Sequence, residues 1–147
     1  MEPAAAQREP TGDFRMSFLI DTDICSAYLK NDPTVVGKVM LHFGGLHVSV
    51  VTVGELLTWA RRAKASPTRS LSVHKLLAAS TIHEVDLTVA DKFGELRAGL
   101  LDQGISVGEM DLLNASVALV NNVTMVTHNT KDYANIPGLT LEDWLVP

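Results

Sequence analysis

The sequence predicts an α/β fold: a three-layer α/β/α domain around a central, mostly parallel sheet of four to five strands. Three observations predict it. Short apolar runs alternate along the chain with longer segments whose apolar residues recur at helical spacing. Residues typical of turns and helix caps separate the two kinds of segment. The chain has 147 residues, which suits one domain with one sheet.

Strands are expected where a short apolar run stands between turn residues. The clearest is Phe18 to Ile20, an apolar run that ends at Asp21 and is typical of a buried strand. Proline and glycine at 137–138 indicate a turn before a last strand at the sheet edge. The expected strands are residues 18–20, 47–51, 82–85, 124–127 and 139–141.

Helices are expected where apolar residues share one face. Asp32 and Pro33 form a helix start, with the aspartate as the cap and the proline in the first turn. Glycines end this helix at 44–45 and a later helix at Gly104. The other helices are expected to begin at Thr52, after Ser70, after a cap at Thr88, and near Ser106.

One domain is expected to span residues 16–147. Residues 1–15 are polar and contain prolines without a period, so we interpret them as a disordered extension or as sequence upstream of a start at Met16. No apolar run approaches the roughly 20 residues that span a bilayer, and the first residues lack the apolar stretch of a secretory signal. Cys25 is the only cysteine, which favours the reducing cytoplasm.

The charge distribution limits the mode of nucleic-acid binding. A net charge of −5 argues against sequence-independent binding through a broad basic surface. It does not exclude a nuclease, because a site made of carboxylates is negative until a cation binds. The main basic cluster is either a set of RNA-phosphate ligands or a solvated helix end and loop. It consists of Arg61, Arg62, Lys64 and Arg69.

Polar residues recur where the expected strands end. Asp21 directly follows the first strand, Glu55 comes one turn after the second, and Asn129 follows the fourth. Asp111 lies at the start of a helix that is apolar on most faces. Because the carboxyl ends of parallel strands lie along one sheet edge, these four side chains can meet there. They are the candidate site residues.

Three carboxylates in one pocket repel one another, so either their pKa values rise or a divalent cation neutralises them. Oxygen ligands favour Mg²⁺ or Mn²⁺ over Zn²⁺. These ions suit phosphoryl chemistry, since they activate water and stabilise charge on the leaving oxygen. The hydroxyls of Thr22 and Thr127 either orient ligands or water or make ordinary strand-end hydrogen bonds. The five histidines show no paired ligand spacing, and only His128 is expected near the site.

Each candidate also has a purely structural explanation. Asp21 can belong to a strand-end turn, and Glu55 can complete a capping box with Thr52. Asp111 suits a helix N-terminus, and Asn129 suits a cap or turn. The functional prediction therefore depends on the four residues as a set.

Segments of the chain resemble, in order, the motifs of PIN domains. The resemblance runs from about Met16 to Trp144, which is nearly the whole chain. Each motif is weak alone, whereas four in order at domain-wide spacing are specific. The segments are residues 19–24, 52–57 and 108–115, followed by 126–133 and 136–139, which resemble the fourth motif and tail of VapC-type toxins.

The resemblance implies a PIN-like fold and a Mg²⁺- or Mn²⁺-dependent endoribonuclease. Asp21, Glu55 and Asp111 would form its acidic metal-binding triad. Asn129 takes the fourth position, which is often aspartate in the family, and Asp132 either supplies that charge or faces solvent or caps the following turn. Metal-activated water would cut tRNA, rRNA or mRNA to give 5′-phosphate and 3′-hydroxyl ends. The resemblance also implies the toxin of a toxin–antitoxin pair, which forms a homodimer and whose antitoxin covers the acidic site.

Two alternatives stay open from the sequence. Asp21 and Asp23 after a first strand also match the nucleophile and acid of haloacid-dehalogenase-like phosphatases, although no convincing lysine motif or late pair of aspartates follows. The second alternative is a catalytically silent PIN-fold interaction module. The three intact acids weigh against it, whereas Asn129 keeps it open.

Overall fold

The computed structural model describes residues 16–147, so the expectation for residues 1–15 lies outside the described part. Its centre is a five-stranded sheet of order β3-β2-β1-β4-β5, in which every neighbouring pair is parallel. The α/β prediction is confirmed, and the sheet is parallel throughout. The strands are β1 (Phe18–Ile20), β2 (Leu46–Ser49), β3 (Thr81–His83), β4 (Thr124–Val126) and β5 (Leu141–Glu142).

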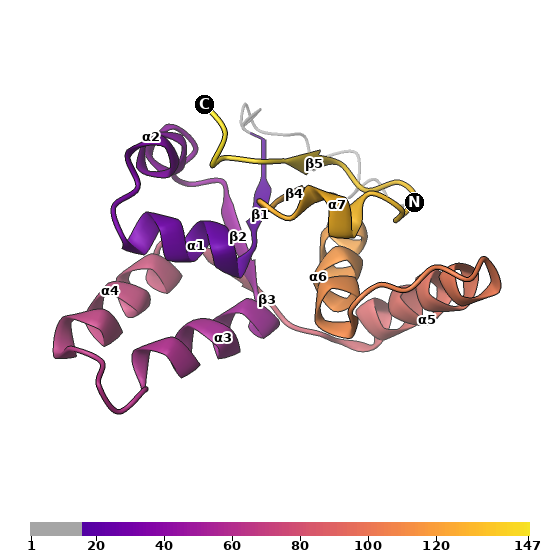
Figure 1. Ribbon diagram of the computed structural model, residues 1–147, viewed down its shortest axis with the longest axis horizontal. Helices are drawn as coiled ribbons and strands as arrows, with labels where there is room; N and C mark the ends of the chain where they lie inside the picture. The colour runs from indigo at the N-terminus through magenta and orange to yellow at the C-terminus, as the bar shows by residue number, and fades with distance from the viewer. Residues whose placement is uncertain (1–15) are drawn as a thin grey trace, which may run out of the picture.

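Helices cover both faces of this sheet. Figure 1 shows α1 to α4 on one side of the strands and α5 and α6 on the other. No helix within residues 16–147 is long and apolar enough to cross a membrane. The helices are α1 (Thr22–Leu29), α2 (Pro33–Leu41), α3 (Val50–Ala60), α4 (Pro67–Ala78), α5 (Leu87–Asp102), α6 (Glu109–Val120) and α7 (Thr130–Tyr133).

The strands bury side chains on both faces. Phe18 and Ile20 of β1 pack into the core formed with α1 to α4, whereas Leu19 between them packs into the core formed with α5 and α6. In β4, Val126 packs into the core with α1 to α4, and Met125 packs into the core with α5 and α6. This alternation explains why the strands read as continuous apolar runs rather than as alternating polar and apolar residues.

The strand order reverses beside β1. From β1 the chain moves outward to β2 and β3, and then returns to place β4 on the other side of β1. The backbone N–H of Asp21 donates to the carbonyl of Val126 at 2.9 Å, so the carboxyl ends of β1 and β4 lie together. Such a switch point is where open parallel sheets bind ligands.

The starts of α3 and α5 differ from the prediction. α3 begins at Val50 rather than at Thr52, because the hydroxyl of Ser49 accepts the backbone N–H of Thr52 at 3.3 Å and caps the helix. The predicted strand 47–51 is therefore too long, since its valines favour strands by local propensity. α5 begins after Asp86, whose carboxylate accepts the N–H of Val89 at 3.0 Å, and not after Thr88.

Other helices were missed or shortened by the prediction. α1 begins directly after β1, with Asp21 as its cap, where the sequence indicated only a turn. α4 begins at Pro67, before the expected start after Ser70. α7 is a single turn of four residues, too short for an apolar period to reveal it.

Candidate active site

The carboxylate of Asp21 lies at the centre of a hydrogen-bond network. It is 8% exposed and follows β1. Its Oδ1 accepts from the backbone N–H of Thr22 at 2.9 Å and from the side-chain amide of Asn114 at 3.3 Å. Its Oδ2 accepts from the hydroxyls of Thr127 at 3.0 Å and Tyr133 at 3.1 Å. Donors from α1, α6, α7 and the end of β4 thus converge on one acid.

Asp21 is a charged group in a poorly solvated place. The pKa of Asp21 is raised to about 6, first by burial and then by the neighbouring charge of Asp23, and the hydrogen bonds from Thr22, Thr127 and Tyr133 offset part of this rise. The donors therefore compensate only part of the lost hydration. A positive charge placed beside Asp21 would favour its ionised form.

Asp111 shares a hydrogen-bond donor with Asp21. It lies in the first turn of α6, and its Oδ1 accepts from the hydroxyl of Tyr133 at 3.2 Å. Burial raises the pKa of Asp111, and the negative charges of Asp132 and Glu55 act in the same direction. A single phenol thus links the first and third predicted acids.

Glu55 joins the same group from the opposite side. It lies on α3 and is exposed. Its Oε1 accepts a hydrogen bond from the hydroxyl of Thr22, the first residue of α1. The backbone N–H of Thr22 also donates to Asp21. Thr22 therefore connects Glu55 to Asp21, and Tyr133 connects Asp21 to Asp111. These contacts bring the three acids together at the carboxyl ends of the parallel strands, as expected.

Asn129 and Asp132 lie at the margin of this network. Asn129 precedes α7 and is exposed, and its side chain makes no capping hydrogen bond. Its backbone N–H donates to the hydroxyl of Thr127 at 3.1 Å. Asp132 lines a shallow cleft of about 250 Å³ together with Asp111 and Lys131. Whether either residue is a metal ligand stays a prediction.

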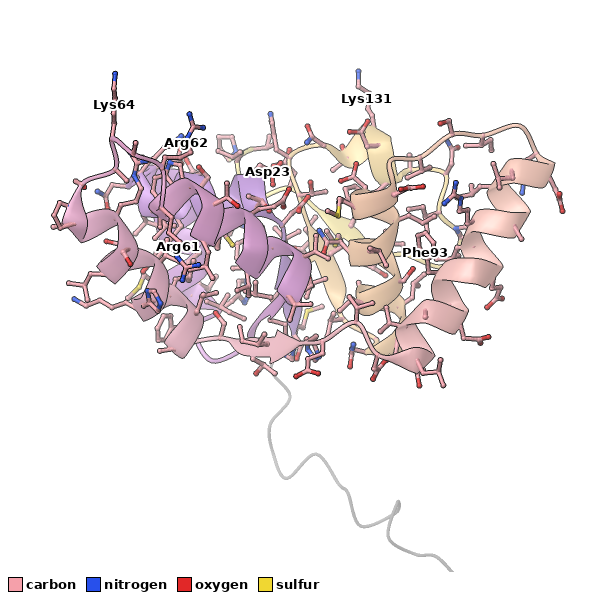
Figure 2. The ribbon with its side chains drawn as sticks, turned by 90° about the horizontal axis from the view of Figure 1, so that it is seen from below. Asp23, Arg61, Arg62, Lys64, Phe93 and Lys131 are labelled. Atoms are coloured by element: carbon pink, nitrogen blue, oxygen red, sulfur yellow. The ribbon has the colours of Figure 1, made fainter. Side chains whose placement is uncertain are left out.

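Asp23 adds a further acid to the site. Its Oδ2 accepts from the backbone N–H of His128 at 3.0 Å, whereas its Oδ1 is buried and has no hydrogen-bond partner among the described residues. Burial raises the pKa of Asp23. A buried oxygen without a donor is costly, so this lone pair is available to a cation or to water. Figure 2 shows Asp23 near the middle of the molecule.

A family model decides the identity of the fold. The model for the PIN domain matches residues 18–139, which include all four candidate site residues. The chain belongs to the PIN domain family. The match assigns Asp21 and Asp23 to a PIN domain, and this excludes the phosphatase alternative.

Several curated relatives of this PIN domain are VapC proteins, which confirms the VapC-type resemblance. The tRNA(fMet)-specific endonuclease VapC of Shigella flexneri is 33% identical over 131 residues, which cover 88% of this chain and 98% of the relative. The protein of the same name from Salmonella typhimurium is 30% identical over the same shares of the two chains. Ribonuclease VapC2 of Rickettsia felis is 28% identical over 132 residues, 88% of this chain and 98% of the relative.

Solved structures give the same result. VapBC2 from Rickettsia felis, bound to a DNA fragment from its promoter, superposes with a TM-score of 0.80 at 28% identity over 88% of this chain and 99% of the other. DNA-bound VapBC from Salmonella typhimurium superposes with a TM-score of 0.81 at 28% identity, over 88% and 98% of the two chains. The PIN-like fold prediction is therefore confirmed.

Sequence reasoning gave no role to two residues of this PIN domain that contact Asp21. Asn114 is 2% exposed on α6, three positions after Asp111 and hence on the same side of the helix. A polar residue among apolar ones on a buried helix needs a partner, and this signal was available in the sequence. No such signal marked Tyr133, because the single turn of α7 is what brings its hydroxyl to Asp21.

The donor chemistry of the site fits a hard divalent cation. Asp21, Glu55 and Asp111 offer only oxygen atoms, which Mg²⁺ and Mn²⁺ prefer. The unpartnered Oδ1 of Asp23 adds negative charge that no hydrogen-bond donor balances. Within residues 16–147, however, no three His, Cys, Asp or Glu side chains already stand close enough together to hold a metal ion. The acids are instead tied to the donors around them.

Proposed function

We propose that this PIN domain is a divalent-metal-dependent endoribonuclease, the toxin of a VapBC-type toxin–antitoxin pair, which hydrolyses RNA phosphodiesters in the cytoplasm. The observation that carries the proposal is the linkage of Asp21, Glu55 and Asp111 through Thr22 and Tyr133 at the sheet edge. The names of the relatives, an endonuclease for tRNA(fMet) and ribonucleases, support the same reaction class.

The residues of this chain prepare the site for hydrolysis. Asp21, Glu55, Asp111 and Asn129 would hold Mg²⁺ or Mn²⁺, which supplies an activated water and neutralises charge on the phosphate. Thr127 and Thr22 hold the carboxylates of Asp21 and Glu55 in defined orientations. Fixed orientation matters because supporting hydrogen bonds commonly change metal affinity or activity by 10- to 100-fold.

A basic end of α3 is the proposed contact for RNA phosphates. Arg61, Arg62 and Lys64 are exposed, and none forms a salt bridge in the part of the chain that the structure describes. Arg69 has a structural role instead, because its guanidinium lies 4.4 Å from the ring centroid of Trp59 and donates to the carbonyl of that residue at 3.1 Å.

Figure 2 supports this assignment of the basic end. In that view Asp23 lies between Arg62 and Lys64 on one side and Lys131 on the other. An RNA strand that crosses the acids therefore has a cation available on each side. Phosphate contacts of this kind position the substrate without reading its sequence.

A protein antitoxin is the proposed second partner. VapBC complexes are among the solved structures most similar to this chain. The end of α2 exposes apolar side chains suited to cover by a protein partner: Met40 is 60% exposed, Leu41 73% and Phe43 46%. An antitoxin arginine beside Asp21 and Asp111 would neutralise the acids and block the site. The homodimer stays a prediction.

The proposed activity is tested with purified protein, tRNA and rRNA. We expect cleavage with Mg²⁺ or Mn²⁺, none in excess chelator, and none by Asp21→Ala or Asp111→Ala proteins that fold by circular dichroism. Asp91→Ala is the matched control, since Asp91 is exposed on α5 and should leave cleavage unchanged. Cleavage in chelator, or by both folded site variants, would reject the mechanism. RNA or antitoxin binding without any cleavage would favour the silent-module alternative.

A further inference from the structure

Hydrogen-bond donors surround both oxygens of the acid at the centre of the site. A carboxylate oxygen offers about two acceptor positions, and each oxygen of Asp21 already accepts two hydrogen bonds. A cation that binds Asp21 therefore has to compete with one of the four donors. One of these donors has to move away from Asp21 when a cation binds.

Three of the donors are fixed by other contacts. The N–H of Thr22 belongs to the first turn of α1. The amide of Asn114 is held through its oxygen by the hydroxyl of Ser49. Thr127 directly follows β4, and its hydroxyl also accepts the N–H of Asn129. Each of these groups is held by a contact that does not involve a second candidate acid.

Tyr133 differs from the other three donors. It ends α7, which has only four residues, and its hydroxyl contacts Asp21 at 3.1 Å and Asp111 at 3.2 Å. A phenol has one proton and can donate it to only one of these carboxylates at a time, and among residues 16–147 Tyr133 is the one donor within reach of both. Its hydroxyl oxygen lies between the two acids, where a cation shared by both would bind.

We propose that the hydroxyl of Tyr133 closes the cation site by standing between Asp21 and Asp111, and that a divalent cation has to displace it. Tyr133 then lowers the affinity for the cation, and it releases the two acids only when a cation takes its place. The inference rests on the proposed cation site at these acids. It makes Tyr133 a residue that controls metal loading rather than a ligand.

The test compares Tyr133→Phe with wild-type protein in a Mn²⁺ titration without RNA, read by electron paramagnetic resonance of free Mn²⁺. We expect the variant to bind Mn²⁺ more tightly by roughly 2- to 10-fold, which corresponds to the net strength of one hydrogen bond. Tyr28→Phe is the matched control, because Tyr28 lies on α1 outside this network and its variant should bind like the wild type.

A second measurement uses the wild-type protein alone. Displacement of the Tyr133 hydroxyl from two carboxylates should change the tyrosine absorbance when Mg²⁺ is added, and Tyr133→Phe should lose this change. Equal or weaker Mn²⁺ binding by Tyr133→Phe, or no tyrosine signal in the wild type, would overturn the inference while leaving the cation site intact. No Mn²⁺ binding by either protein would overturn the cation site and the inference together.

Discussion

The side-chain amide of Asn114 donates a hydrogen bond to Oδ1 of Asp21 at 3.3 Å, although the two residues lie 93 positions apart in the chain. The opposite end of the Asn114 side chain accepts from the hydroxyl of Ser49, which is fully buried at the end of β2. The carboxylate of Asp21, which only accepts, fixes which end of the amide faces it, and the hydroxyl of Ser49 then donates to the amide oxygen at the other end. A strand, a helix and the central acid are thus coupled by one buried amide.

Replacing Asn114 with leucine should reduce RNA cleavage by about 10- to 100-fold, because Asp21 loses an orienting donor. The buried hydroxyl of Ser49 loses its acceptor, so the free energy of unfolding should fall by about 1–3 kcal/mol. Cleavage rates and urea unfolding measure the two effects. Ser116→Ala is the control, since it removes another buried hydroxyl of α6 that bonds only the carbonyl of Leu112. Wild-type cleavage by Asn114→Leu would show that the amide has no role in orientation.

The position of Asp21 followed from the sequence through one rule, that the carboxyl ends of parallel strands share a sheet edge, whereas Glu55 and Asp111 were placed beside it as residues near the starts of helices. That rule needs only the strand positions, which the apolar runs reveal. The start of α3 was misjudged, because Ser49 as a helix cap and valine as a strand former give opposite local signals. The roles of Asn114 and Tyr133 depend on contacts between distant segments, which no local pattern contains.

Asp21 should make the protein less stable as the pH rises from about 4 to about 6. Its pKa is raised from 3.8 to about 6 in the folded state, so the folded protein binds more protons than the unfolded chain in this window. The free energy of unfolding then falls as the pH rises, by up to about 3 kcal/mol in total. Denaturant unfolding at pH 4.5, 5.5 and 7 measures the slope.

The variant Asp21→Asn isolates this contribution. It cannot ionise, so it should have a flatter pH profile and unfold less readily than the wild type at pH 7, while losing cleavage. Asp91→Asn, an exposed change on α5, should reproduce the wild-type profile. An unchanged slope in Asp21→Asn would assign the pH dependence to other groups.

His47 and His83 should give the opposite pH dependence. Nδ1 of His47 lies 2.7 Å from Nε2 of His83 on the neighbouring strand, so one proton at most fits between the two rings. Burial lowers the pKa of both residues, and the charge of His83 lowers the pKa of His47 as well. Below pH 6.5 the unfolded chain therefore binds more protons than the folded protein, and stability falls as the pH falls.

The histidine effect is best measured in the Asp21→Asn protein, where the opposing slope is absent. Adding His83→Gln should reduce the loss of stability between pH 6.5 and pH 5. Adding His74→Gln should not, because His74 is exposed on α4 and, among residues 16–147, forms side-chain hydrogen bonds with Ser70 alone. Equal slopes in both double variants would argue that the pair titrates as it does in the unfolded chain.

The basic end of α3 should control how strongly salt weakens RNA binding. Each cation that neutralises a phosphate of single-stranded RNA contributes about 0.7 to the slope of log affinity against log salt concentration. Replacing Arg61, Arg62 and Lys64 by glutamine should therefore lower the slope by about 2 and weaken binding of every RNA sequence alike. Binding is measured by filter retention at several salt concentrations, with Asp111→Ala in the background to prevent cleavage.

Lys92→Gln is the control for this experiment, because Lys92 pairs with Glu95 at 3.0 Å on α5, away from the basic end. Its slope should match that of the parent protein. The experiment distinguishes the two interpretations of the basic cluster. Removing phosphate ligands lowers the slope of log affinity against log salt concentration, whereas removing side chains of a solvated helix end leaves it unchanged. An unchanged slope in the triple variant would leave Lys131, beside Asp111 in the shallow cleft, as the remaining candidate for the phosphate contact.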